Sequence, residues 1–94
     1  MQNVVIFSEL MNMAREGWLM DHKSTRTKHF YRDERSWHRQ RYVFVDTGRP
    51  IPNQPTLLKR RDYLHIEDAT KEWKRLRCEG WTQVKPQWGS GLDV

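Results

Sequence analysis

This sequence has only one cysteine, Cys78, among its 94 residues, so it cannot form an intramolecular disulfide. A disulfide framework is thereby excluded, and the scarcity of cysteine fits a reducing, cytoplasmic setting. Long apolar runs are also missing: the patch near the N-terminus, Val4 to Phe7, has four residues and no basic residues before it. This pattern indicates neither a signal peptide nor a membrane-spanning helix. We therefore expect a cytoplasmic protein that makes no use of a membrane.

The sequence is also poor in aliphatic residues and rich in charge, with 31% charged residues. Such a composition can indicate disorder. Five tryptophans, three tyrosines and three phenylalanines argue against disorder, because each ring can bury about 150–250 Å². We expect one domain with a thin core built from a few rings.

No motif for catalysis or for metal binding is present. His22, His29, His38 and His65 are scattered, without the close spacing of zinc ligands. Cys78 falls near the end of a predicted helix, whereas reactive thiolates favour helix N-termini or a neighbouring base. Phosphate-binding glycine loops and nucleophile elbows are missing too. We predict no catalytic residue, no cofactor and no metal, and hence a protein that is not an enzyme.

Residues 1–15 are predicted to be an extension, helical or disordered, before a domain at 16–88 and a flexible tail at 89–94. Ile6, Leu10 and Ala14 have helical spacing, which favours a short amphipathic helix. A second interpretation is that translation starts at Met11 or Met13, which would leave the first residues without a structural role. Both interpretations stay open at this point.

Four strands are predicted in the first two thirds of the domain, at 17–22, 27–33, 41–45 and 56–64. Alternation places Phe30 on one face of its strand and His29 and Tyr31 on the other. Residues 41–45 are apolar on both faces, as expected of a central strand. Residues 46–55 contain one glycine and three prolines, which predict a loop.

A helix is predicted at about 66–79, because Ile66, Ala69, Trp73 and Leu76 share one face. Acidic residues begin it and basic residues end it, in the order that suits the helix dipole, and Gly80 follows as a C-terminal cap. Its N-terminus lacks a preferred capping residue. A short last strand follows within residues 81–88. The expected fold is α+β: a small, mainly antiparallel sheet of four or five strands with one helix on one face.

The net charge of +5 is concentrated between residues 22 and 41, a segment that contains seven basic and two acidic residues. Arginines alternate there with aromatic residues, as in surfaces that bind single-stranded nucleic acid. A solvated, salt-screened strand pair is the competing interpretation. Three tryptophans, at 18, 73 and 81, are assigned to the core, and Trp37 is equally consistent with core and surface. The candidate contact residues are Arg32, Arg35, Trp37, Arg39, Arg41, Lys59, Arg60 and Arg61.

Two classes of partner suit these residues. Nucleic acid is the better supported, because cations can neutralise its phosphates. An acidic protein partner is the alternative, with Trp37 and Trp88 as exposed anchors and the arginines as steering charges. Trp88 is otherwise expected to hold the last strand over the helix.

Several segments together resemble a family of small proteins of unknown function found mainly in marine cyanobacteria. The matching segments are EGWL, FYRDERSW, VFVDTGRPIP, LLKRR, EDATKEWKRLRCEGW and PQW, in that order, over about residues 16–88. The resemblance implies a cyanobacterial cytosol and places residues 1–15 outside the shared region. It implies no activity, cofactor or site residue.

Overall fold

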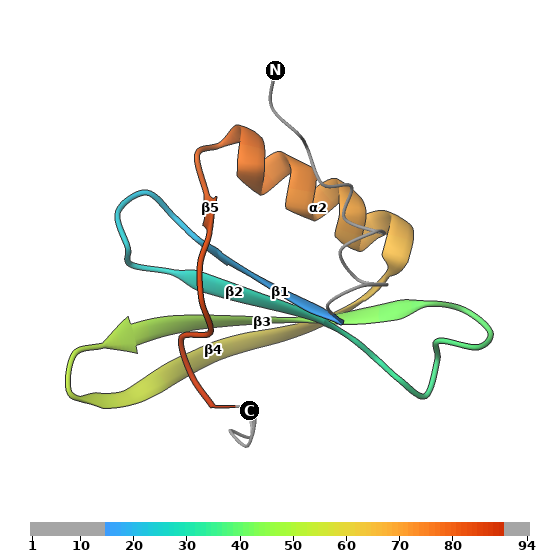
Figure 1. The fold of residues 1–94 in the computed structure, drawn as a ribbon, viewed down its shortest axis with the longest axis horizontal. Coiled ribbons are helices and arrows are strands. Elements are labelled where there is room, and N and C mark those ends of the chain that lie inside the picture. Colours follow the sequence, from blue (N-terminus) through green and yellow to red (C-terminus); the bar gives the residue numbers. More distant parts are fainter. Residues whose placement is uncertain (1–14, 90–94) are drawn as a thin grey trace.

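One antiparallel sheet of five strands, with one helix against one of its faces, makes up residues 15–89, which the computed structural model describes (Figure 1). The strands lie in the order β4-β3-β2-β1-β5. The elements are β1 (Glu16–Met20), β2 (Thr27–Arg32), β3 (Tyr42–Ile51), β4 (Gln54–His65), α2 (Ile66–Cys78) and β5 (Thr82–Gln83). The predicted α+β fold is confirmed, whereas the helix considered for residues 1–15 lies outside the described residues, apart from Arg15.

The core lies between α2 and the sheet. Because side chains alternate along a strand, paired residues such as Phe30 and Val45 point to the same face. The ring of Phe30 meets Trp73 of α2 edge-on, at 5.1 Å between centroids. The buried residues of this core are Leu19, Phe30, Val43, Val45, Ala69, Trp73 and Leu76. The predicted alternation in β2 and the predicted apolar face of the helix are confirmed.

Both ends of α2 are capped by residues next to it. The imidazole Nδ1 of His65 accepts a hydrogen bond from the backbone N–H of Glu67, at 3.3 Å, so His65 caps the helix although it is not a preferred capping residue. At the other end, the N–H groups of Gly80 and Trp81 donate to the carbonyls of Arg77 and Leu76. Gly80 has φ +96°, so this end is a Schellman motif that requires a left-handed residue.

The predicted loop at 46–55 is instead a long hairpin, with β3 running to Ile51 and β4 starting at Gln54. Two irregularities in the β3–β4 register, at Thr47/Gly48 and at Arg49/Ile51, interrupt the ladder there. The pairing of β2 with β3 ends at Gly48, so the last residues of β3 pair only with β4. Proline is tolerated at such one-sided and bulged positions, which is why Pro50 does not end the strand.

The last predicted strand, within residues 81–88, is reduced to the two residues of β5. After β5 the chain crosses to the face of the sheet opposite α2 (Figure 1). There the ring of Trp88 packs edge-on against Trp18 at 4.6 Å and against His29 at 6.2 Å. The expectation that Trp88 holds the last strand over the helix was therefore wrong. It closes a second, smaller cluster of rings on the face that α2 leaves open.

His29 lies at the centre of this second cluster with only 7% of its surface exposed. Its ring stacks on Trp18 at 3.8 Å and on Tyr31 at 4.5 Å. Its Nε2 lies 2.9 Å from a carboxylate oxygen of Glu16. Burial lowers the pKa of His29, and the hydrogen bond and charge of Glu16, with the charge of Asp46, oppose this effect.

Substituting Gly48 by alanine is expected to destabilise the fold by about 1–3 kcal/mol, as overpacking does. A Cβ atom at Gly48 would lie 2.9 Å from the Trp88 ring and 3.1 Å from the Leu58 side chain. Chemical denaturation measures the cost. Gly89→Ala is the control, because a Cβ there meets nothing within 4 Å. The loss of unfolding free energy caused by Gly48→Ala should be smaller in a Trp88→Ala background. An equal loss in both backgrounds would show that the Trp88 ring does not pack against Gly48.

Acidification below pH 6.5 is expected to reduce the free energy of unfolding through His29. Its pKa is lower in the folded chain than the ordinary value of 6.5, so the unfolded chain binds more protons in that window and gains stability relative to the fold. One such proton contributes at most about 1.4 kcal/mol per pH unit. An NMR titration of the His29 ring should give a midpoint below 6.5, and a midpoint at or above 6.5 would contradict the burial argument.

Candidate functional site

The loop between β2 and β3, residues 33–41, holds exposed arginines at one end of the sheet. Ser36 fixes the loop: its hydroxyl donates to the carbonyl of Asp33 at 2.9 Å and accepts from the N–H of Tyr42 at 3.0 Å. Arg35 and Arg39 are exposed on this frame, and within residues 15–89 neither has a carboxylate partner. The loop therefore presents two free guanidinium groups to solvent.

Trp37 belongs partly to the core and partly to this loop. Its ring packs against the buried cluster, while the guanidinium groups of Arg32 and Arg41 lie 5.1 and 5.7 Å from its centroid. Arg32 also pairs with Glu34 at 2.7 Å. Cation–π contacts of this kind hold two of the predicted contact residues against the protein itself.

Aromatic rings also form a row on the open face of the sheet. Tyr31 stacks on Phe44 at 5.3 Å, Phe44 lies 4.8 Å from Tyr63, and Tyr63 stacks on Tyr42 at 4.7 Å. Tyr63 is 48% exposed, and its hydroxyl donates to Asp33 in the neighbouring loop. Each ring of the row therefore has at least one face against a neighbouring ring.

Arg61, one of the predicted contact residues, is also engaged on the open face. Its guanidinium forms two hydrogen bonds to the carboxylate of buried Asp46, at 2.7 and 3.0 Å, and lies over the Phe44 ring. The Tyr31 hydroxyl donates to the same carboxylate at 3.0 Å. Burial, with the Asp46 hydrogen bond and charge, raises the pKa of Tyr31 to about 12. The Asp46 carboxylate thus accepts hydrogen bonds from both Arg61 and Tyr31, and the Arg61 guanidinium is used mainly to bind Asp46.

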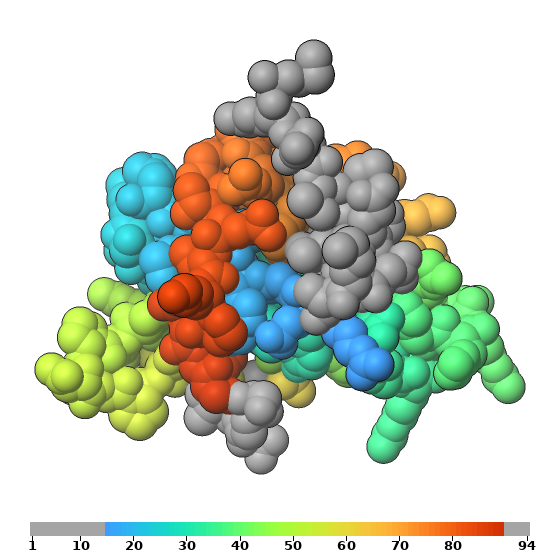
Figure 2. Space-filling view, viewed as in Figure 1, coloured from blue at the N-terminus to red at the C-terminus, as the bar shows by residue number. Residues whose placement is uncertain are grey.

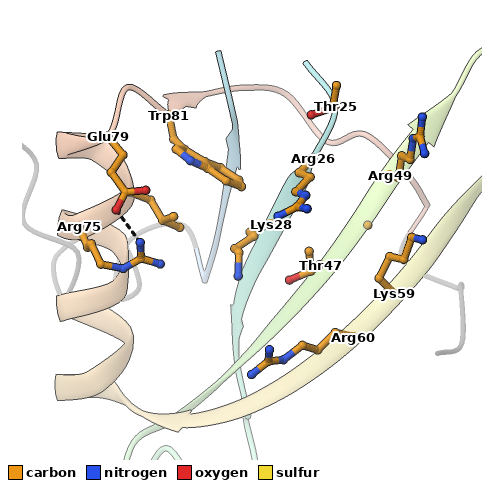
Figure 3. A pocket seen from close by; sticks show the side chains of 12 residues that line it. Thr25, Arg26, Lys28, Thr47, Arg49, Lys59, Arg60, Arg75, Glu79 and Trp81 are labelled. Carbon is orange, nitrogen blue, oxygen red and sulfur yellow. Dashed lines mark hydrogen bonds and ion pairs between the residues drawn. The ribbon is translucent and has the colours of Figure 1, made fainter. Parts of the chain in front are cut away.

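A basic cavity of about 670 Å³ lies on the helix side of the sheet, between the C-terminal half of α2 and the far part of the β3–β4 hairpin (Figure 3). Six basic residues and one acidic residue, Glu79, line it. The basic residues are Arg26, Lys28, Arg49, Lys59, Arg60 and Arg75. We call this cavity the basic pocket.

A β-bulge places two neighbouring basic residues in the basic pocket. Along a regular strand Lys59 and Arg60 would point to opposite faces. Here Arg60 pairs with Thr47 and Leu58 with Gly48, so Lys59 is the extra residue of the bulge. Both side chains line the pocket, as expected because bulges redirect side chains.

The pocket cations differ in how far they are neutralised. Arg75 pairs with Glu72 and Glu79, and Arg60 pairs with Asp62 at 2.9 Å. No ion pair within residues 15–89 involves the remaining four, Arg26, Lys28, Arg49 and Lys59. Lys28 is only partly exposed, and burial lowers its pKa, although Glu72 and Asp62 act in the opposite direction.

The predicted contact residues thus separate into two groups. The loop 33–41 lies at one end of the molecule (green) and the tip of the β3–β4 hairpin at the other (yellow-green), as Figure 2 shows. Arg35, Arg39 and Arg41 belong to the loop end, and Lys59 and Arg60 belong to the pocket end. The candidate contact residues did not include four cations of the pocket, namely Arg26, Lys28, Arg49 and Arg75. No local signal could have joined them, because only the strand register and the path of α2 bring them together.

Between Arg15 and Gly89, no cluster of three or more histidine, cysteine, aspartate or glutamate side chains could hold a metal ion. In the same range, α2 falls short of the length and apolar character that a bilayer-crossing helix needs.

A family model described as "Protein of unknown function (DUF1651)" covers residues 16–88. No curated protein and no solved structure matches the chain. Since the family model covers more than half of the chain, the chain belongs to this family of proteins of unknown function.

Proposed function

We propose that this chain is a small, non-enzymatic protein that binds nucleic acid, chiefly through contacts to phosphates. The exposed thiol of Cys78 suits a reducing cytoplasm. A cyanobacterial cytosol, implied by the resemblance of the sequence motifs, is the setting that we propose.

The observation that carries this proposal is the number of cations without a carboxylate partner. Arg35 and Arg39 at the loop end have none within residues 15–89, and the same holds for four cations of the basic pocket. Cations held near one another repel unless an anion neutralises them. Phosphates spaced along a nucleic-acid strand supply such anions, and the released counterions add to the affinity.

Base stacking contributes less to this proposal than the sequence pattern indicated. Tyr31 is stacked between His29 and Phe44, and Tyr42 is stacked on Tyr63. A base would have to displace a neighbour to reach the faces on which these rings meet. Binding dominated by phosphate contacts predicts strong salt dependence with little preference for sequence.

The affinity for a single-stranded oligonucleotide is expected to fall linearly on a plot of log affinity against log salt. Each phosphate contact contributes about 0.7 to the slope, so the double variant Arg35→Gln/Arg39→Gln should lose about 1.4. Fluorescence anisotropy at several salt concentrations measures the slope.

A matched control for this experiment is Lys71→Gln/Lys74→Gln, which removes the same charge from exposed positions of α2 that do not line the pocket. Its slope should stay close to that of the wild type. Equal losses in both double variants would mean that net charge, and not the loop, sets the affinity. An affinity independent of salt would overturn the proposal.

A second candidate function is binding of a protein partner through the open face. The observation in its favour is the row of rings that α2 does not cover, with Tyr63 48% exposed. Trp88, the other anchor expected from the sequence, is committed to Trp18 and His29.

Co-purification from native cells with and without nuclease separates the two candidates. The proposed function predicts that nuclease treatment removes the co-purifying partners. Partners that persist after nuclease, and that are lost on Tyr63→Ser, would favour the protein-binding alternative.

A further inference from the structure

A row of three side chains forms the floor of the basic pocket. Lys28 of β2 pairs with Thr47 of β3, and Thr47 pairs with Arg60 of β4, so the three residues lie side by side on the helix face of the sheet. In β2 and β3 the next residues on this face, Phe30 and Val45, belong to the core, whereas in β4 the next residue is Asp62, which pairs with Arg60. The floor therefore begins where the apolar core ends.

Two groups in this row lack a partner. The hydroxyl of Thr47 is buried and makes no hydrogen bond within residues 15–89. The ammonium of Lys28 is half-buried, and no ion pair or hydrogen bond to it occurs in the same part of the chain. A buried polar group without a partner costs free energy. Both groups are hydrogen-bond donors, and both residues line the same cavity.

The walls of the pocket add further positive charge around the floor. Arg49 and Lys59 come from the hairpin, and Arg26 comes from the end of the β1–β2 turn; their side chains surround the cavity in Figure 3. Glu79, the one acidic residue in the lining, is already paired with Arg75. The cavity is thus a half-open concentration of positive charge with hydrogen-bond donors in its lining.

We infer that the basic pocket binds a phosphate monoester, with Lys28 and Thr47 as the floor and Arg49 and Lys59 as closing cations. A monoester carries up to two negative charges and three acceptor oxygens at neutral pH, whereas a phosphodiester within a strand carries one charge. Several cations and a free hydroxyl suit the monoester better. The inference rests on the proposed function, because the phosphorylated end of a nucleic acid is the natural source of such a group; a free nucleotide has the same chemistry.

The test measures binding of the full chain to one oligonucleotide sequence with and without a terminal phosphate, and to the corresponding free mononucleotide. The terminal phosphate is expected to raise the affinity at least roughly tenfold, as one added charge-assisted contact does. The double variant Arg49→Gln/Lys59→Gln, at two exposed positions, should abolish this preference. Lys71→Gln/Lys74→Gln removes the same charge from exposed positions of α2 outside the pocket and should preserve this preference.

The outcomes separate this inference from the proposed function. Equal affinity for phosphorylated and unphosphorylated oligonucleotides would overturn the monoester site while leaving nucleic-acid binding intact. Binding of the mononucleotide, lost in the pocket variant but with no binding of any oligonucleotide, would support the site and overturn the proposed function. A terminal-phosphate preference that survives Arg49→Gln/Lys59→Gln would place the site elsewhere and overturn the inference.

Discussion

The contact between α2 and the sheet determines what every other part of this small domain can do. Phe30 and Trp73 meet at its centre, and the seven buried residues of the core all belong to the sheet or to α2. The helix has 13 residues and so spans about 20 Å, whereas β4 has 12 residues and extends about 40 Å. One helix of this length cannot cover the whole sheet, so the part of the helix-side face that extends beyond α2 carries polar side chains.

That uncovered part is where the basic pocket lies. The C-terminal half of α2 forms one wall, and the β3–β4 hairpin extends past the helix to form another. Lys28 is two residues from Phe30 on the same face of β2, so the transition from core to cationic floor takes place within one strand. The length mismatch between helix and hairpin thus explains both the cavity and the partial burial of Lys28.

A simpler role for some of these cations also follows from the topology. β4 is an edge strand, and charged residues on an edge strand discourage pairing with another sheet. Lys59, Arg60 and Arg61 can serve this purpose wherever their side chains point. Edge protection does not explain why Arg26 and Arg49, from other parts of the chain, surround the same cavity, or why Lys28 is partly buried within it.

The parts of the structure that depend on local pattern could be predicted from the sequence. Alternation placed Phe30 on the opposite face of β2 from His29 and Tyr31, and helical spacing identified the apolar side of α2. The hairpin at 46–55 was missed because bulges and one-sided pairing accommodate its prolines, and neither feature has a local signal. Likewise, the residues of the basic pocket come from two turns, three strands and a helix, so only the register brings them together.

The most direct test of this account is the pKa of Lys28, followed by NMR through its side-chain carbon next to the ammonium group. The account predicts a pKa below the ordinary lysine value of 10.5 in the free protein, because burial among cations disfavours the charged form. It also predicts that the pKa rises when a phosphorylated oligonucleotide is added. A Lys28 that titrates at 10.5 or above, unchanged by that ligand, would contradict the claim that a partly desolvated, unpaired cation forms the floor of this pocket.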